Sequence, residues 1–156
     1  TKAYCTRVGN GPFPTEELGE IGETLREKGG EFGVTTGRAR RCGWLDAMAV
    51  KYACRINGVS ALAMMKLDVL DGFETIQVCT GYKDCNGNVL EDFPSDLAQV
   101  TPIYMHFKGW DKTAGVREFS KLPKNAQDYI LALEKFIGVK IAMISTSPDR
   151  NDTIFR

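Results

Sequence analysis

The sequence predicts an α/β fold, in which strands and helices alternate and ligands bind beyond the carboxyl ends of the strands. Two observations favour this class. Short apolar runs typical of buried parallel strands end in polar loops, as at residues 61–66 and 140–144. Longer segments carry apolar residues at helical spacing, as at residues 44–56 and 125–137.

The first third of the chain predicts a strand and two helices. Residues 2–8 alternate and are rich in Tyr, Thr and Val, which is typical of a strand. Thr15 is a predicted N-cap with acidic residues after it, and Leu18 would belong to the apolar stripe of the helix that follows. Gly29-Gly30 would end this helix, and the second helix is expected at 44–56.

The rest of the chain predicts further strands and one helix. The strands are expected at residues 61–66, 75–82, 102–107, 140–144 and, at a sheet edge, 153–155. Asn86-Gly87 is a hairpin signal after the second of these strands. The helix is expected at 125–137, after Pro123.

Composition excludes several classes of protein. The 156 residues are enough for one domain with its own core. The 20 Lys and Arg residues balance the 20 Asp and Glu residues, which argues against nucleic-acid binding and against attraction to an anionic membrane. The longest apolar stretch, Val59 to Met65, is too short to cross a bilayer. Residues 1–7 lack the apolar core of a signal peptide.

Five cysteines without a C-x-x-C pair predict free thiols and hence a cytoplasmic location. The single histidine, His106, excludes a His-rich metal site, and we interpret it as a surface or strand residue. Cys42, although next to several arginines, is interpreted as a bystander thiol. The chain starts directly in a predicted strand with no initiator Met. That start is typical of a piece cut from a longer protein, although a complete protein could begin in the same way.

Residues 33–41 form the segment richest in groups that bind anions. Threonine hydroxyls and backbone amides can hold a carboxylate, and arginine side chains bind carboxylate or phosphate in a bidentate manner. Arg38 and Arg40 are two residues apart, so in an extended loop they would project to the same side. The alternative is a solvated basic loop at the start of a helix, where positive charge is unfavourable.

Lys66-Leu67-Asp68 follows a predicted buried strand. An aspartate there can accept two N–H donors from a guanine edge, and a lysine two residues earlier can lie over the base. The same Lys-x-Asp spacing occurs in the base-recognition motif of GTPases. Three residues alone are weak evidence, and a structural ion pair or loop cap is the alternative.

The loop 145–150 also follows a buried strand and carries hydroxyls that could close over a ligand, although by itself it is an ordinary turn. Residues 8–12 do not form a dinucleotide fingerprint, because the third glycine is missing and no helix starts there.

Taken together, these segments resemble one family, adenylosuccinate synthetase. The matching segments occur in the order and spacing of the family over nearly the whole chain, at residues 6–9, 11–16, 30–38, 40–46, 66–72, 109–110, 144–146 and 148–150. The resemblance covers about the last third of the family's sequence. It implies that residues 1–156 are the C-terminal portion of a mostly parallel-sheet, P-loop-type nucleotide-binding fold.

Enzymes of this family couple GTP hydrolysis to the joining of IMP and L-aspartate. The 6-oxygen of IMP is phosphorylated, and the aspartate amine then displaces phosphate to give adenylosuccinate. The resemblance therefore implies a GTP-dependent carbon–nitrogen ligase of purine biosynthesis that is cytoplasmic and homodimeric when complete.

The resemblance also implies roles for particular residues. The aspartate-binding loop would comprise Val34, Thr35, Thr36, Gly37, Arg38, Ala39 and Arg40, with Val8 at the IMP ribose. The GTP site would comprise Lys66, Leu67, Asp68, Ser145, Thr146 and Ser147, with Arg40 helping to place the nucleotide. Ser147 stands where the family usually has glycine, and such a serine is tolerated unless the backbone needs a positive φ.

The phosphate loop of the family, its catalytic aspartate that also meets Mg²⁺, and its general-acid histidine lie upstream of the matched region. No catalytic or metal-binding residue is therefore expected in this segment, and the 156 residues alone should be inactive. One alternative is a stand-alone, non-catalytic guanine-nucleotide-binding module, and another is a purely structural domain. Asp68→Ala would relax guanine specificity in a complete ligase but change nothing in a structural domain.

Overall fold

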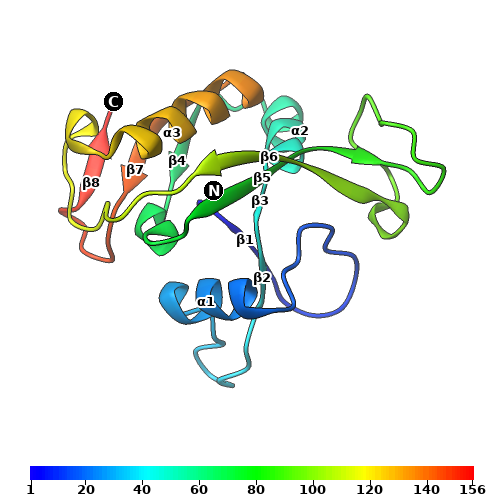
Figure 1. The fold of residues 1–156 in the computed structure, drawn as a ribbon, viewed down its shortest axis with the longest axis horizontal. Helices are drawn as coiled ribbons and strands as arrows, with labels where there is room; N and C mark the ends of the chain where they lie inside the picture. Colours follow the sequence, from blue (N-terminus) through cyan, green and yellow to red (C-terminus); the bar gives the residue numbers. More distant parts are fainter. The chain divides into compact units, whose positions relative to one another are not determined.

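The computed structural model describes residues 1–156, and the chain divides into two units. Unit 1 comprises Thr1–Ala3, Ala49–Ile76 and His106–Arg156, and unit 2 comprises Tyr4–Met48 and Gln77–Met105. The arrangement is mixed α/β, as the sequence predicts (Figure 1).

Unit 1 is built on a three-stranded sheet in the order β4-β7-β8. β4 (Ala61–Met64) runs parallel to β7 (Lys140–Ser145), and β8 (Thr153–Phe155) is antiparallel to β7. Strands β4 and β7 arise where the sequence has short apolar runs, and β8 is the predicted edge strand. Because β4 and β7 are parallel neighbours, the loops that follow them leave the sheet at the same edge.

Helices complete unit 1. α3 (Lys124–Ile137) packs against β7 and ends at Gly138, whose φ of 81° is the left-handed conformation that favours glycine (Figure 1). α2 spans Ala47–Asn57, and two short 3-10 helices lie at η1 (Leu67–Leu70) and η3 (Phe119–Lys121). The core is formed by side chains that are at most 1% exposed, which include Met64, Leu67, Leu70, Tyr129, Ile130, Leu133, Ile141 and Ile144.

Unit 2 contains an antiparallel ribbon and most of a second sheet. β1 (Cys5–Arg7) pairs with β2 (Arg41–Gly43), and α1 (Glu20–Gly29) packs on β2. The sheet has the order β3-β5-β6, with β3 (Leu45–Asp46) parallel to β5 (Thr75–Lys83) and β6 (Thr101–Lys108) beside β5. Beyond β5, the predicted hairpin turn forms, since Gly87 N donates to Asp84 O at 3.0 Å. The last short helix is η2 (Leu97–Gln99).

Two predicted helix starts are wrong, and pairing between distant segments explains both. α1 begins at Glu20 after Gly19, not after Thr15. Residues 15–17 are extended because Glu17 N donates to Cys42 O at 3.0 Å and Trp44 N donates to Thr15 O at 3.1 Å. Leu18 is 87% exposed and belongs to no apolar stripe.

The other wrong start is that of α2, which begins at Ala47 rather than Trp44. Leu45 and Asp46 pair in parallel with Val78 and Cys79 of β5, so they form a strand and not a helical turn. The first strand is also shorter than predicted, since only Cys5–Arg7 pair with β2.

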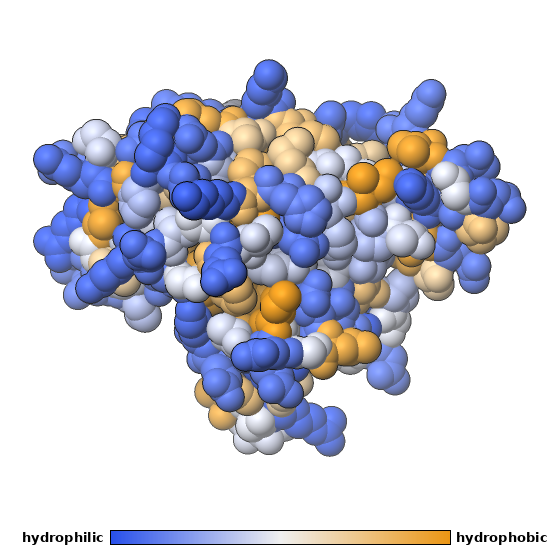
Figure 2. All heavy atoms as spheres, viewed as in Figure 1, coloured by the Kyte–Doolittle hydropathy of each residue, from blue (hydrophilic) through white to orange (hydrophobic).

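The surface carries scattered hydrophobic groups. On the face shown in Figure 2, hydrophilic residues cover most of the surface and hydrophobic residues form separate patches. Separately exposed apolar side chains of this kind are common on protein surfaces. None of the helices is both long enough and apolar enough to cross a membrane.

All five cysteines carry free thiols, as the sequence predicts. Cys42, Cys54 and Cys79 are buried, Cys5 is partly buried and Cys85 is exposed. Cys42 is only 1% exposed, so its thiol is closed to solvent in spite of the arginines beside it.

Candidate functional site

The two segments predicted to bind guanine lie together in unit 1. Lys66-Leu67-Asp68 comes directly after β4, and Ser145-Thr146-Ser147 begins at the last residue of β7. Met64 and Ile144 are register partners in these parallel strands. The two segments therefore leave the sheet at the same edge, and Lys66 N donates a hydrogen bond to Ser145 Oγ at 3.0 Å.

Lys66 has an unusual backbone conformation. Its φ of 63° and ψ of 42° are left-handed, and it is the only residue other than glycine with a positive φ. Such a conformation costs an L-residue roughly 1–2 kcal/mol, and strain of this kind concentrates at functional sites.

Asp68 is held by the short helix η1. Leu67 and Leu70 are fully buried, so they anchor the helix, while Lys66 and Asp68 are only partly buried. Burial raises the pKa of the Asp68 carboxyl, the charge of Asp71 raises it further, and a backbone hydrogen bond and the charge of Lys66 oppose the shift. A carboxylate that is partly desolvated gains more from N–H donors of a ligand than a fully solvated one would.

The hydroxyls of the second segment shape the loop. Thr146 Oγ1 donates to Val116 O at 2.7 Å, and Ser147 Oγ donates to Asp152 Oδ2 at 2.7 Å. Asp152 also accepts from Arg117 Nε at 2.8 Å, and these hydrogen bonds, that of Ser147 first, lower the pKa of Asp152. With Ser145 Oγ bonded to Lys66, all three hydroxyls have partners inside unit 1.

Asp71 has a structural role that was not predicted from the sequence. Its carboxylate accepts from Trp110 Nε1 at 2.9 Å, from Thr113 N and Oγ1 at 2.8 and 2.7 Å, and from Ala114 N at 3.1 Å. Asp71 N also donates to Asp68 O at 3.1 Å, so Asp71 connects the loop 110–114 to the end of η1. Gly109-Trp110 is one of the segments that resemble the family, but nothing in the sequence predicts that Trp110 contacts Asp71.

The loop predicted to bind aspartate lies in unit 2 and is a tight hairpin. Phe32 and Ala39 form an antiparallel bridge, Gly33 N donates to Arg38 O at 2.8 Å, and Gly37 N donates to Gly33 O at 2.8 Å. Gly37 has a φ of 63°, which closes the turn. Its tip is exposed, including the side chains of Val34, Thr35, Thr36, Arg38 and Ala39.

The two arginines of this loop have different surroundings. The Arg38 side chain is exposed and makes no hydrogen bond or ion pair within the chain. Arg40 Nη1 donates to Glu31 Oε2 at 2.8 Å, and Glu31, which is fully buried, also accepts from Tyr4 Oη at 2.5 Å. Arg40 Nε is buried without a hydrogen-bond partner. The Arg40 guanidinium therefore uses one of its nitrogens, Nη1, to hold the base of the hairpin.

Val8 follows β1, where Arg7 is the register partner of Arg41. It is 77% exposed. The loop after Val8 is held by Arg41, whose Nε and Nη2 donate to both carboxylate oxygens of Glu16 at 2.8 and 2.5 Å. Arg41 Nη1 donates to Gly9 O and Gly11 O at 3.1 and 2.8 Å.

The Glu16–Arg41 pair predicts a stability change with pH. The hydrogen bonds from Arg41 lower the pKa of Glu16 from about 4.5, although partial burial opposes the shift. A carboxyl whose pKa is lower in the folded state stabilises the fold above its unfolded pKa, and this contribution is lost as the pH falls through the folded pKa. Glu16→Gln should therefore lower the free energy of unfolding by about 1 kcal/mol at pH 7 and have little effect at acid pH.

Urea titrations of wild type and Glu16→Gln across pH 3–7 would measure this difference. Glu91→Gln, an exposed acid in the same unit, is the matched control. A Glu16→Gln effect that stays constant over the whole pH range would contradict the role given to the carboxylate.

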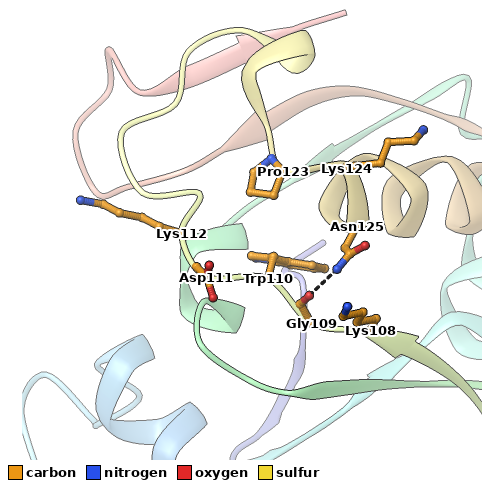
Figure 3. A pocket seen from close by; sticks show the side chains of 8 residues that line it. All are labelled: Lys108, Gly109, Trp110, Asp111, Lys112, Pro123, Lys124 and Asn125. Carbon is orange, nitrogen blue, oxygen red and sulfur yellow. Dashed lines mark hydrogen bonds between the residues drawn. The ribbon is translucent and has the colours of Figure 1, made fainter.

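A cavity of about 530 Å³ lies in unit 1 beyond β6 and is separate from the residues predicted to bind ligands. It is lined by Lys108, Gly109, Trp110, Asp111, Lys112, Pro123, Lys124 and Asn125. Asn125 Nδ2 donates to Gly109 O at 2.7 Å (Figure 3). Lys112 and Lys124 point away from each other, and Trp110 is only 4% exposed, so no set of groups converges on a ligand there.

The predicted residues thus divide between the two units. Lys66, Leu67, Asp68, Ser145, Thr146 and Ser147 belong to unit 1, and Val8 with residues 34–40 belongs to unit 2. The chemistry of the first group suits the edge of a purine with adjacent N–H donors. The second group offers hydroxyls, backbone amides and an unpaired guanidinium, which suit a carboxylate.

Comparisons with known proteins agree on one family. A family model described as adenylosuccinate synthetase matches residues 1–154. The adenylosuccinate synthetase of Helicobacter hepaticus is 65% identical over 153 residues, which are 98% of this chain and 37% of that protein. The enzyme of Wolinella succinogenes is 59% identical over 155 residues, 99% of this chain and 37% of that protein.

A solved structure, that of fully ligated adenylosuccinate synthetase from Plasmodium falciparum, matches with a TM-score of 0.95 and 42% identity over 99% of this chain and 38% of that one. The chain therefore spans just over a third of the length of the relatives it matches. With residues 1–154 matched by the family model, the chain belongs to the adenylosuccinate synthetase family.

Proposed function

We propose that this chain is part of a GTP-dependent ligase that joins IMP and L-aspartate to give adenylosuccinate, GDP and phosphate. In this proposal unit 1 binds the guanine base and unit 2 binds aspartate and IMP. The observation that carries it is the contact between Lys66 and Ser145. It joins the two segments expected at the base, at the edge of the sheet where α/β proteins bind their ligands.

On the guanine side, the Asp68 carboxylate accepts hydrogen bonds from N1 and the exocyclic amine, and the Lys66 stem lies over the base. These two N–H groups occur together on guanine but not on adenine, so the pair would select GTP over ATP. Partial burial strengthens these hydrogen bonds relative to a fully solvated carboxylate.

On the aspartate side, Thr35, Thr36 and the backbone amides of the hairpin hold the substrate carboxylates together with Arg38. Arg38 also reaches toward IMP, Val8 lies at the IMP ribose, and Arg40 helps to place the nucleotide and aspartate. The exposed hairpin tip and the unpaired Arg38 guanidinium support these roles, since a free fork can bind a carboxylate in a bidentate manner.

The remainder of the catalytic machinery is assigned to other parts of the complete polypeptide. No three His, Cys, Asp or Glu side chains come together here in a way that could hold a metal ion. We propose that the Mg²⁺ ligands and the catalytic residues belong to the remaining two-thirds of the family's length. We further propose that the complete protein is a cytoplasmic homodimer.

Expression of the complete polypeptide and an assay of phosphate release test this function. Release should require GTP, IMP and aspartate together. The isolated residues 1–156 should release no phosphate with all three substrates present. A well-folded complete polypeptide that binds guanine nucleotide without release would instead indicate a non-catalytic binding module, and one that binds no nucleotide would indicate a structural domain.

Arg38 is expected to set the affinity for aspartate. In the complete polypeptide, Arg38→Ala should raise the KM for aspartate by roughly 10- to 100-fold, because hydrogen bonds to a charged group contribute about 1.5–3 kcal/mol. Arg38→Lys should recover only part of this loss, since an ammonium cannot form the bidentate contact.

The matched control for this measurement is Arg55→Ala. Arg55 is an exposed arginine on α2 that belongs to neither predicted group. An aspartate KM that is the same in Arg38→Ala, Arg55→Ala and wild type would remove Arg38 from the site.

A further inference from the structure

Resting on the proposed function, we propose that Glu31 is a positioning residue for the substrates held by unit 2. Its carboxylate fixes the guanidinium of Arg40 so that one nitrogen, Nη2, is left for a ligand, and Glu31 itself does not contact that ligand. Three features carry this inference: the burial of the carboxylate, the tyrosine that holds it, and the unequal surroundings of the three Arg40 nitrogens.

The Glu31 carboxylate is buried and has a donor on each oxygen. The residue is 0% exposed, and a buried charge is costly unless it is paired. Oε1 accepts from Tyr4 Oη at 2.5 Å, and Oε2 accepts from Arg40 Nη1 at 2.8 Å. The backbone is held as well, because Glu31 N donates to Arg26 O at 2.9 Å. The carboxylate therefore cannot rotate without losing these hydrogen bonds.

Tyr4 is a fixed partner of this carboxylate. It is 2% exposed and comes directly before β1. Its hydroxyl lies against the end of α1, where a Cβ atom on Gly29 would clash with Tyr4 Oη. The hydroxyl thus fills space that glycine leaves open, and it keeps Glu31 Oε1 in place.

The three nitrogens of the Arg40 guanidinium have unequal surroundings. Nη1 is bonded to Glu31, and Nε is buried without a hydrogen-bond partner. Nη2 has no partner within the chain and is not buried, and the side chain as a whole is 34% exposed. A guanidinium is planar and rigid, so a fixed Nη1 and an enclosed Nε also fix Nη2. Arg40 thus offers a ligand one pre-oriented donor, whereas the exposed Arg38 offers a whole, unrestrained fork.

The alternative is that the pair of Glu31 and Arg40 only stabilises the hairpin. Backbone hydrogen bonds already close this hairpin, since Gly33 N donates to Arg38 O at 2.8 Å and Arg40 N donates to Glu31 O at 2.9 Å. A buried ion pair is weak evidence of a stabilising role, because the cost of desolvating both charges offsets their attraction. The orientation of Arg40 is therefore the effect that the pair adds to the backbone contacts.

A double-mutant cycle in the complete polypeptide tests the inference. The four proteins are wild type, Glu31→Gln, Arg40→Lys and the double variant, and the measurement is kcat/KM for aspartate and for GTP by steady-state phosphate release. Glutamine keeps the shape of the side chain and one acceptor but removes the charge that holds the guanidinium. Lysine can keep the ion pair, but its single nitrogen cannot hold a second one at a fixed position.

We expect Glu31→Gln to lower kcat/KM by about 10-fold for at least one of these two substrates in the wild-type background, the effect of releasing one immobilised side chain. In the Arg40→Lys background the same substitution should change kcat/KM less than about 2-fold. Glu27→Gln, an exposed glutamate of α1 in the same unit, should change neither value. If the Glu31→Gln protein does not fold, Tyr4→Phe replaces it, because it removes a donor to Glu31 and keeps the carboxylate. It should give a smaller loss with the same dependence on position 40.

Equal losses in both backgrounds would show that Glu31 acts through the hairpin and not through Arg40, which would overturn the inference. A folded Glu31→Gln protein with wild-type kcat/KM for both substrates would overturn it as well. A wild-type polypeptide that releases no phosphate with all three substrates would overturn the proposed function, and the inference with it.

Discussion

Asp68→Asn in the complete polypeptide should raise the KM for GTP by roughly 100-fold and make XTP the better substrate. In the proposed guanine site, the carboxylate accepts hydrogen bonds from two adjacent N–H groups of the base, and each bond to a charged acceptor contributes about 1.5–3 kcal/mol. Asparagine keeps one acceptor oxygen but presents an amide donor to the exocyclic amine of guanine, so two donors face each other.

Xanthine reverses this mismatch. It carries a carbonyl oxygen where guanine has its amine, so the asparagine amide can donate to that oxygen and accept from N1–H. Asp68 and asparagine have nearly the same shape, which keeps η1 and its buried residues Leu67 and Leu70 in place.

Steady-state phosphate release with GTP and with XTP would measure the change. Asp111→Asn, an exposed acid of the same unit, is the matched control. A variant at position 68 whose ratio of GTP to XTP turnover equals that of wild type would remove Asp68 from base recognition, whatever its effect on stability.

Gly109→Ala is expected to lower the free energy of unfolding by about 3 kcal/mol or more. A Cβ atom at this position would lie 1.6 Å from Phe73 O and 2.7 Å from Phe73 C. These are backbone atoms, and Gly109 N donates to Glu74 O at 2.8 Å, so neither side can move away without breaking this pairing.

The substitution should also disturb the hydrogen bonds to the neighbouring Asp71 carboxylate. Trp110 O accepts from Gly72 N at 2.8 Å, and the Trp110 indole donates to Asp71, so a shift at Gly109 displaces the donors around that carboxylate. Guanine-nucleotide binding should weaken along with stability, because Asp71 caps the helix that carries Asp68.

The midpoint of urea unfolding, followed by tryptophan fluorescence, is a suitable measurement. Gly81→Ala is the control, since its Cβ would meet only Ile103 side-chain atoms at 3.6 Å or more, which is ordinary contact. Equal midpoints for the two variants would mean that the backbone at Gly109 can relax.

Elements that depend on local sequence were predictable. β4, β7 and α3 lie within about one or two residues of their expected bounds, because apolar runs and helical periodicity fix them locally. The starts of α1 and α2 were not predictable, because residues 15–17 and 45–46 pair with strands that come later in the chain.

The candidate site divides in the same way. The residue types at 34–40 predict an anion site by themselves, whereas those at 66–68 predict a purine site only together with the family resemblance. The hydrogen bond from Lys66 N to Ser145 Oγ joins residues that are 79 positions apart, and Arg40 forms an ion pair with Glu31, which is fully buried. A single sequence contains no pattern that predicts either contact.

The distribution of the thiols has a practical consequence. Cys85, at the turn beyond β5, is the one exposed cysteine, whereas the other four are buried or partly buried. A maleimide dye should therefore attach first at this turn, which lies outside both groups of predicted binding residues. Within these 156 residues, the natural sequence already provides a labelling position for fluorescence or spin-label distance measurements, without any substitution.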